Sequence, residues 1–299
     1  MSITAEAVRQ LRERTGAGMM ECKKALVETK GDLDAAAELM RRQGLAKADK
    51  KASRVTAEGV VVVARSGDQR TAALVEINCE TDFVAREQEF RGFAQAVAEG
   101  ALAARPAGVA ELGAVRLPGG ESIEERRRAL IAKIGENVSV RRFAVLSSPD
   151  HLGAYVHGTR IGALVAVRGG AAGLAHDLAM HVAASNPRYL SAAQVPAEVV
   201  AKEREILTSQ AQNEGKPPEI VARMVEGRLR KALSEITFTG QPFVKEPEVT
   251  IEKLLKGAGA EVLAFERFEV GAGLEKRAED FVAEVMAQVK RSDGGPIRH

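Results

Sequence analysis

Two passages of this 299-residue sequence match each other at a constant offset of 125 residues, and this repeat limits the folds available to the chain. Each passage follows two predicted strands and a helix, and each consists of a helix and a final strand. The matched pairs are Leu130 and Leu255, Glu136 and Glu261, Arg142 and Arg267, Phe143 and Phe268, and Val145 and Val270. Duplication of one unit explains this order, so the sequence predicts an α+β fold with two related core subdomains and antiparallel sheets.

The first core unit begins where the apolar period changes. EGVVVVARSGDQRTAALVEINC predicts strands at 60–64 and 72–77, joined by a turn through Gly67 and Asp68. A helix follows, with Phe90, Phe93, Ala94 and Val97 on one face. In the second unit, GAYVHGTRIGALVAVRGG predicts another hairpin and LAHDLAMHVAAS the helix after it.

Helices are predicted on both sides of these units. Three short ones fill the first 45 residues, in which Thr4 and Asp32 are caps and Gly44 ends the third helix. The basic stretch LAKADKKASR that follows is predicted to be a linker, for which partly helical structure is left open. Helices at 196–212 and 218–233 form an antiparallel hairpin, whose facing residues are expected to be Val199, Val200, Ile206, Leu207, Ile220, Val221, Met224 and Leu229.

These segments divide the chain into five predicted parts. They are an N-terminal three-helix UBA-like domain with its linker (1–54), a core N-subdomain (55–142), a core C-subdomain (143–185 and 234–270), an inserted helical hairpin (186–233) and a C-terminal helix with its tail (271–299).

Charge and cysteine content exclude several classes of protein. Basic and acidic residues number 43 and 41, so a surface that grips nucleic acid throughout is not expected, and no specific nucleic-acid partner is predicted. Cys22 and Cys79 are too few for a disulfide framework or a zinc site. The sequence has no apolar run of about 18 residues and its N-terminus lacks the core of a signal peptide. We therefore expect a cytoplasmic protein with no membrane partner.

The motifs that usually mark catalysis are missing from the sequence. It contains no GxxxxGK[ST] string, no GxGxxG after a strand and no nucleophile elbow. His176 and His181 are five residues apart, which does not place them on one helical face as metal ligands. We expect no enzymatic activity, no catalytic residue, no cofactor and no metal. A hydrolase that uses His157 or Cys79 is the alternative, and it would require substrate-dependent turnover.

The string TDFVAR at 81–86 has two interpretations. In the structural one, Thr81 or Asp82 caps a helix, and Phe83 and Val84 pack against the sheet. In the functional one, Asp82 and Phe83 stand at an exposed tip, where a charge and a ring project together toward a partner.

RTGAGMMECKKAL (14–26) and NCETDFVAR (78–86) closely resemble the two signature regions of the elongation factor Ts family. KIGENVSVRR, HGTRIGALVA, MHVAASNPRYL, VEGRLRK, TGQPFV and RFEVG resemble further segments of that family in the same order. The resemblance implies a guanine nucleotide exchange factor of translation elongation. Such a factor binds elongation factor Tu with GDP, displaces Mg²⁺ and GDP, and stabilises the nucleotide-free partner until GTP binds. The resemblance also implies the long form with both subdomains, and a homodimer through the 186–233 hairpin.

The resemblance further implies which residues meet the partner. Beside the magnesium site of Tu, the contact residues are Thr81, Asp82, Phe83 and Val84, supported by Ile134 and Gly135. In the N-terminal domain they are Arg12, Met19, Met20 and Lys23. In the core, the contact residue is His157. Each has a structural alternative. Met19 and Met20 could belong to a core, although neighbours on a helix cannot both point inward, so at least one should be exposed. Arg12 and Lys23 alone would be ordinary solvated charges, and His157 could cap a hairpin turn.

A binding module for RNA is the rival from another class. Residues 41–54 contain six basic side chains and one acid, but no aromatic residue with which bases could stack. A solvated linker is the more common role for such a run.

Overall fold

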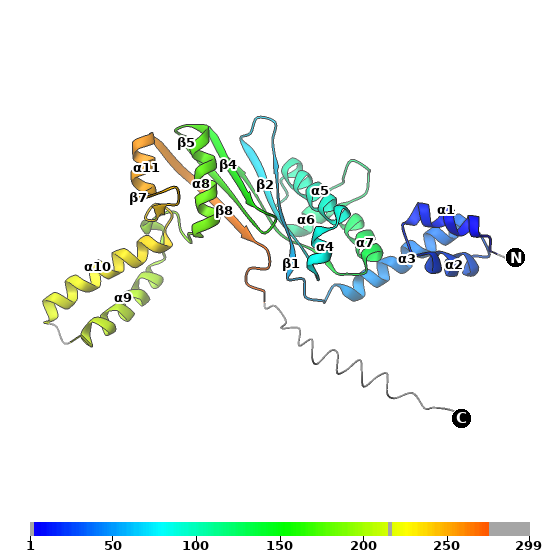
Figure 1. The fold of residues 1–299 in the computed structure, drawn as a ribbon, viewed down its shortest axis with the longest axis horizontal. Coiled ribbons are helices and arrows are strands. Elements are labelled where there is room, and N and C mark those ends of the chain that lie inside the picture. The colour runs from blue at the N-terminus through cyan, green and yellow to red at the C-terminus, as the bar shows by residue number, and fades with distance from the viewer. Residues whose placement is uncertain (1–2, 215–216, 275–299) are drawn as a thin grey trace, which may run out of the picture.

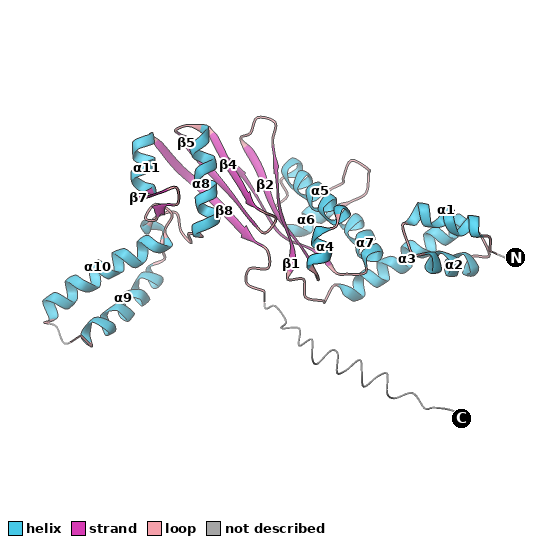
Figure 2. Cartoon of the chain, in the orientation of Figure 1, coloured by secondary structure: helices cyan, strands magenta, loops and turns pink. Residues whose placement is uncertain are grey.

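The computed structural model describes residues 3–214 and 217–274, and its mixture of helices and antiparallel sheets confirms the predicted α+β class (Figure 1). Two three-stranded sheets lie at the centre, with helices on their outer sides (Figure 2). The N-terminal helices lie at one end of the elongated molecule, and a helical hairpin lies at the other. Every helix within the described ranges is too short or too polar to cross a membrane.

Three N-terminal helices, α1 (Ala5–Thr15), α2 (Met19–Glu28) and α3 (Leu33–Lys51), form a small bundle. The Thr4 hydroxyl accepts a hydrogen bond from the Ala7 N–H (3.2 Å) and caps α1. Gly16 ends the same helix with φ 66°, a left-handed conformation that glycine adopts without strain. The centre of the bundle is filled by Val8, Leu11, Cys22, Ala25, Leu26 and Ala36.

Helix α3 is longer than the sequence predicts. We expected it to end at Gly44 before a linker, but it continues to Lys51 through most of that linker. At Gly44 an added Cβ would lie 2.9 Å from Cβ of Ala132 on α7 (Ile123–Ile134), so the glycine allows the two helices to approach closely. This packing offsets the cost of about 1 kcal/mol that glycine imposes inside a helix.

The first core sheet pairs β1 (Glu58–Arg65), β2 (Thr71–Cys79) and β3 (Val138–Ser147) antiparallel in that order. One face is covered by α4 (Asp82–Arg86), α5 (Gln88–Ala104), α6 (Val109–Ala114) and α7. The helix face predicted from Phe90, Phe93, Ala94 and Val97 is buried in this core. Strand β3 extends past the boundary predicted between residues 142 and 143, because residues 143–147 continue to pair with β2. The division between the sheets therefore falls after Ser147.

The second sheet repeats this plan. Strands β4 (His151–His157), β5 (Ile161–Gly169) and β8 (Ala260–Glu269) pair antiparallel in that order, and α8 (Ala172–Ser185) and α11 (Ile251–Ala258) pack on them. A short hairpin of β6 (Pro242–Phe243) and β7 (Glu246–Thr250) precedes α11. Each unit thus adds its third strand to the second strand of its hairpin, as the sequence repeat predicts.

The two sheets pack face to face across an apolar layer. Its members come from both units and are Val61, Ala72, Leu74, Leu152, Leu164, Ala166, Phe268 and Val270. Gly162 lies in this layer, where an added Cβ would stand 2.5 Å from Cγ1 of Val61. The glycine therefore permits the close approach of the sheets, which joins the two subdomains into one four-layered core.

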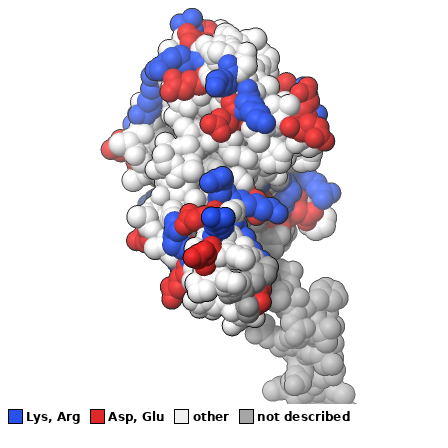
Figure 3. All heavy atoms as spheres, turned by 90° about the vertical axis from the view of Figure 1, so that its left-hand side faces the viewer, with Lys and Arg blue, Asp and Glu red and all other residues white. Residues whose placement is uncertain are grey.

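A hairpin of α9 (Ala197–Gln212) and α10 (Pro218–Ile236) is inserted between α8 and β6. Its buried seam contains Leu207, Ala211, Val221, Val225 and Leu229. Ile206 and Ile220 were expected in this seam, but both are exposed, because they lie on helix faces turned away from the partner helix. At this end of the molecule, acidic and basic side chains are interspersed (Figure 3).

The base of the insertion is closed by a buried histidine. His181 of α8 contacts Gln241, whose Oε1 lies 3.1 Å from Nε2, and the Val244 N–H donates to Nδ1 (3.3 Å). These partners indicate the neutral tautomer with its proton on Nε2. Gln241 in turn donates to the carbonyls of Ser185 and Glu235, which end α8 and α10. The network thereby connects both ends of the insertion.

Folding stability should decrease on mild acidification because of His181. Burial lowers the pKa of His181 below its ordinary value, and the hydrogen bond to Gln241 opposes this only in part. The unfolded chain therefore binds a proton below about pH 6.5 that the folded chain excludes, so this contribution to stability is complete above that pH and is lost as the pH falls. Urea unfolding at pH 7.5 and 5.5 measures the effect.

The matched control is the exposed His176 on the same helix. His181→Gln should reduce the dependence of unfolding free energy on pH over this interval, and comparison with His176→Gln shows whether the reduction is specific to the buried position. Equal pH dependence in the unmodified protein and His181→Gln would contradict the prediction.

Candidate functional site

The turn that follows β2 places one aromatic ring in solvent. Thr81 is the N-cap of α4, and its hydroxyl accepts a hydrogen bond from the Val84 N–H (3.4 Å). Phe83 is 78% exposed, whereas Val84 and Ala85 are buried in the core beside α5. Successive helical residues point about 100° apart, so a five-residue helix that buries residues 84 and 85 turns residue 83 outward. We call residues 81–84 the 81–84 turn.

Each of the two interpretations of TDFVAR therefore holds for some of its residues. Thr81 caps a helix and Val84 packs against the core, as the structural interpretation requires. Phe83 projects from the tip, as the functional interpretation requires. Val84 stays a predicted contact residue, although its side chain is buried in the protein's own core.

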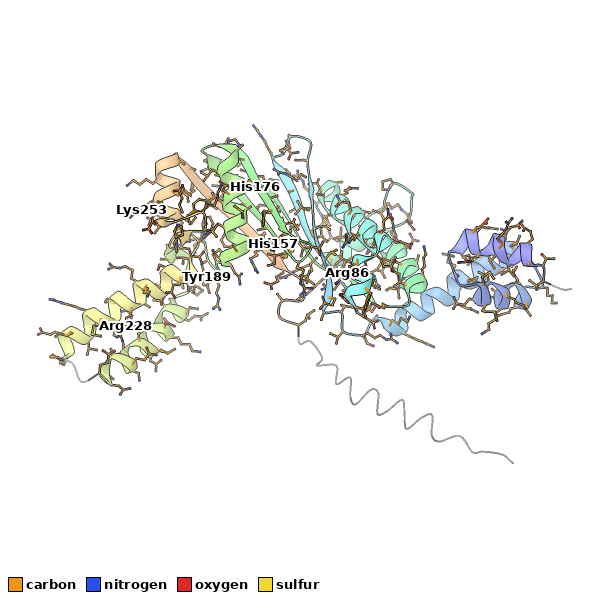
Figure 4. All side chains as sticks on the ribbon, in the orientation of Figure 1. Arg86, His157, His176, Tyr189, Arg228 and Lys253 are labelled. Carbon is orange, nitrogen blue, oxygen red and sulfur yellow. The ribbon has the colours of Figure 1, made fainter. Side chains whose placement is uncertain are left out.

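Asp82 is the charged member of the tip. Its Oδ2 accepts a hydrogen bond from Nη2 of Arg86 (2.7 Å), four residues later on α4 (Figure 4 labels Arg86). The Arg86 side chain is exposed and that of Asp82 is half-exposed, so this pair between residues four apart on a helix contributes only about 0.3–0.5 kcal/mol. Asp82 can therefore exchange Arg86 for a group on another molecule at low cost.

Ile134 and Gly135 lie at the end of α7, directly before two residues that form hydrogen bonds with residues 80 and 81. Ile134 packs against the core of the first subdomain, and Gly135 ends α7 with φ 86°. The carboxylate of Glu136 accepts hydrogen bonds from both the Thr81 N–H (3.0 Å) and the Thr81 hydroxyl (2.8 Å). The sequence predicted the support from 134–135 but not the role of Glu136, since nothing in the sequence pairs two residues 55 positions apart.

Each of the predicted N-terminal contact residues is exposed. Arg12 and Lys23 are exposed, and Met19 and Met20 are 57% and 66% exposed, so the expectation that at least one methionine faces solvent is confirmed. Val27 is 60% exposed and follows Met20 by seven residues, which places both on one face of α2. Sequence analysis missed Val27, although its helical spacing from Met20 was visible.

His157 ends β4 and is exposed, and Tyr155 on the same strand holds it. The Tyr155 hydroxyl lies 3.1 Å from Nδ1 of His157, and the Tyr155 ring meets His176 edge to face at 5.9 Å between centroids. Figure 4 labels both histidines, on β4 and on α8. His157 therefore presents a ring whose orientation is fixed by a neighbour.

The alternatives to a protein-binding site find little support in the structure. Burial raises the pKa of Cys79 to about 12, with the Glu136 and Glu58 carboxylates adding to the effect, so its thiol is a poor nucleophile at neutral pH. Its Sγ donates to the Thr81 carbonyl (3.1 Å) and so helps to fix the turn. Within the described residues, no three His, Cys, Asp or Glu side chains are grouped to hold a metal ion.

The basic 41–54 stretch uses several of its charges within the protein. Arg41 and Arg42 pair with Glu38, while Lys51 donates to the Gly135 carbonyl and Arg54 pairs with Glu80. The three arginines are largely exposed, so they can exchange these acidic partners for other anions at low cost, as Asp82 can exchange Arg86.

Comparison with known proteins identifies the family. The family described as Elongation factor TS matches residues 80–272, which is more than half of the chain. The elongation factor Ts of Thioalkalivibrio sulfidiphilus is 58% identical over 97% of this chain and 99% of its own length. This chain belongs to the elongation factor Ts family. Elongation factor Ts of Methylococcus capsulatus is 58% identical over 98% of this chain and 100% of its own length. Elongation factor Ts of Legionella pneumophila is 52% identical over 97% of this chain and 99% of its own length.

Membership of the elongation factor Ts family confirms the resemblance drawn from 14–26 and 78–86. The similarity also covers the segments that carry Glu136, Tyr155 and Val27, because the matches extend over nearly the whole chain. The individual contact residues implied by that resemblance stay predictions.

Proposed function

We propose that this protein is the guanine nucleotide exchange factor of translation elongation that acts on elongation factor Tu. In this proposal it binds Tu with GDP, displaces Mg²⁺ and GDP, and stabilises the nucleotide-free partner until GTP binds. Family membership supports the partner and the process. The observation that carries the proposal is the exposed Phe83 at the tip of a turn held from below by Glu136. A large aromatic side chain exposed at the tip of a turn can fill a pocket on a partner, as the aromatic anchors of protein interfaces do.

The exchange reaction requires no chemistry from this chain. A protein that binds nucleotide-free Tu more tightly than GDP-bound Tu weakens GDP binding by the same factor, because the coupling between the two ligands is reciprocal. Each tenfold weakening requires about 1.4 kcal/mol of differential binding. Several orders of magnitude therefore need more contact area than the 81–84 turn alone offers.

The proposal divides this work between surfaces. Two surfaces would hold the partner and supply binding energy: the face of α2 that carries Met19, Met20 and Lys23, and the region of the core around His157. Phe83 would insert between partner helices, and Asp82 would perturb the polar network near Mg²⁺. With the metal loosened, the diphosphate loses its main counter-charge. The elongated arrangement, in which these residues lie on separate parts of the molecule, supports such a division (Figure 1).

Release of mant-GDP from purified elongation factor Tu tests the proposal. Stopped-flow fluorescence in excess GDP should show faster release when this protein is added, with a rate that rises with its concentration. An identical release rate with and without the protein would overturn the proposed function.

The homodimer through the 186–233 hairpin stays a prediction. Ile206 on α9 and Ile220 on α10 are exposed apolar side chains, and they offer a surface on which a second copy could pack. Sedimentation equilibrium distinguishes the dimer from the monomer.

A further inference from the structure

The 81–84 turn is joined to a second part of the chain by one carboxylate. Both oxygens of Glu136 accept hydrogen bonds from a single residue, Thr81, through its N–H (3.0 Å) and its hydroxyl (2.8 Å). The same hydroxyl accepts from the Val84 N–H. Glu136 therefore fixes the rotamer and the backbone direction of the residue from which α4 starts.

The segment that carries Glu136 is itself held in place. The Asn137 N–H donates to Oε1 of Glu80 (2.6 Å), and its side-chain amide donates to the carbonyl of Arg54 (2.9 Å). Lys51, at the end of α3, donates to the Gly135 carbonyl. The 81–84 turn is thus connected through residues 135–137 to the end of the helix that leads to the N-terminal bundle.

Phe83 depends on this support because its own side chain receives little packing. The ring is exposed, so its direction follows from the backbone of α4 alone. A helix of five residues is far too short to be stable by itself. Val84 and Ala85 hold its inner face against the core, and Glu136 holds its first residue.

We propose that Glu136 is a positioning residue, which keeps the 81–84 turn rigid so that Phe83 is presented to the partner in one direction. This inference rests on the proposed function, since the benefit of rigidity lies in the contact with Tu. A turn whose backbone is already ordered loses less conformational entropy on binding, so rigidity strengthens the contact without adding any atom to it. Glu136 and Thr81 are only half-buried, so water can replace their hydrogen bonds and the fold survives the loss of Glu136.

A tryptophan reporter tests the rigidity without any partner. The chain contains no Trp, so Phe83→Trp introduces a single fluorophore at the tip. Time-resolved anisotropy of Phe83→Trp should show a larger nanosecond depolarisation when Glu136→Ala is added. Glu136→Gln, which retains one acceptor oxygen, should give an intermediate loss of anisotropy. Unchanged anisotropy in Glu136→Ala would overturn the positioning role.

Glu111→Ala is the matched control. The Glu111 carboxylate also accepts a backbone N–H, that of Ala107 (2.9 Å), in the same subdomain. The Glu111→Ala substitution removes the same charge and a similar hydrogen bond without touching the turn. The anisotropy of Phe83→Trp with Glu111→Ala should equal that of the Phe83→Trp parent, and circular dichroism should show that all variants are folded.

Exchange kinetics test whether the rigidity serves function. With Phe83 intact, Glu136→Ala should reduce the acceleration of mant-GDP release about tenfold, which corresponds to about 1.4 kcal/mol, and Glu136→Gln should reduce it less. Lower anisotropy with unchanged acceleration would overturn the link between rigidity and exchange. If the unmodified protein did not accelerate release at all, the proposed function would fail, while the anisotropy data would still decide whether Glu136 orders the turn.

Discussion

Replacing Phe83 with alanine is expected to reduce the acceleration of GDP release from elongation factor Tu roughly 30- to 150-fold. A central aromatic side chain that enters a pocket on a partner is commonly worth about 2–3 kcal/mol. The loss should fall mainly on the exchange rate, because in the proposed arrangement the α2 surface and the core region of His157 would still hold the partner. Stopped-flow release of mant-GDP measures the rate, and calorimetric titration onto nucleotide-free Tu measures the affinity.

The fold should tolerate this change. Phe83 is exposed, so its truncation creates no cavity and should alter the unfolding free energy by less than about 0.5 kcal/mol. Val109→Ala is a suitable control, since Val109 is another exposed apolar residue of the same subdomain. Phe83→Leu separates bulk from aromaticity. A rate of release equal to that of the unmodified protein would show that the ring has no part in exchange.

Periodicity and repetition were enough to predict the core. The alternation of apolar residues and the 125-residue offset gave two hairpins, two helices and two final strands, and the sheets pair accordingly. Such patterns record which face of an element is buried, and burial dominates the local choice of structure. The boundary placed at 142/143 falls inside β3, whose residues 143–147 continue to pair with β2.

The errors arose because local sequence signals do not record how helices pack on one another. Gly44 is a helix terminator by propensity, yet it lies in α3 because α3 crosses α7 there and only a glycine fits against Ala132. Ile206 and Ile220 are apolar but exposed, so hydrophobicity alone assigned them to the wrong face of the hairpin. The C-terminal helix predicted after residue 272 cannot be compared, since residues 275–299 lie outside those described.

The candidate site was only partly visible in the sequence. An exposed Phe83 and exposed methionines followed from the resemblance and from helix geometry. Glu136 and Asn137 did not, because a hydrogen bond between segments about 55 residues apart leaves no periodic trace. Only the packing of α7 against the first sheet brings residues 135–137 beneath the turn.

Glu76 is expected to be the most important single charge for stability. Its carboxylate is fully buried on β2, where it accepts from Arg141 (2.8 Å) and Arg142 (2.6 Å) on β3 and from the Gly271 N–H (2.8 Å) beyond β8. Burial by itself would raise the pKa of Glu76, but the Gly271 N–H and the two guanidinium groups outweigh it and hold the pKa below its usual range. The residue therefore ties the first sheet to the end of the second.

Glu76→Ala should lower the free energy of unfolding by about 3–5 kcal/mol, because it leaves two partly buried arginines and a buried N–H without their acceptor. Urea unfolding at pH 7 measures this, and Glu261→Ala is the control. Glu261 pairs with Arg168 across β5 and β8 at 2.9 Å, but both side chains are exposed, so its loss should cost less than about 1 kcal/mol.

The dependence on pH separates the charge of Glu76 from its packing. Since its pKa is depressed in the folded state, the ionised carboxylate stabilises the protein above about pH 4.3, the ordinary value for glutamate, and this contribution is lost as the pH falls toward the folded-state pKa. The unmodified protein should therefore lose more stability than Glu76→Gln between pH 6 and 3. Two results would contradict this role of Glu76. One is an equal loss of unfolding free energy in the unmodified protein and Glu76→Gln between pH 6 and 3. The other is an equal decrease in unfolding free energy for Glu76→Ala and Glu261→Ala.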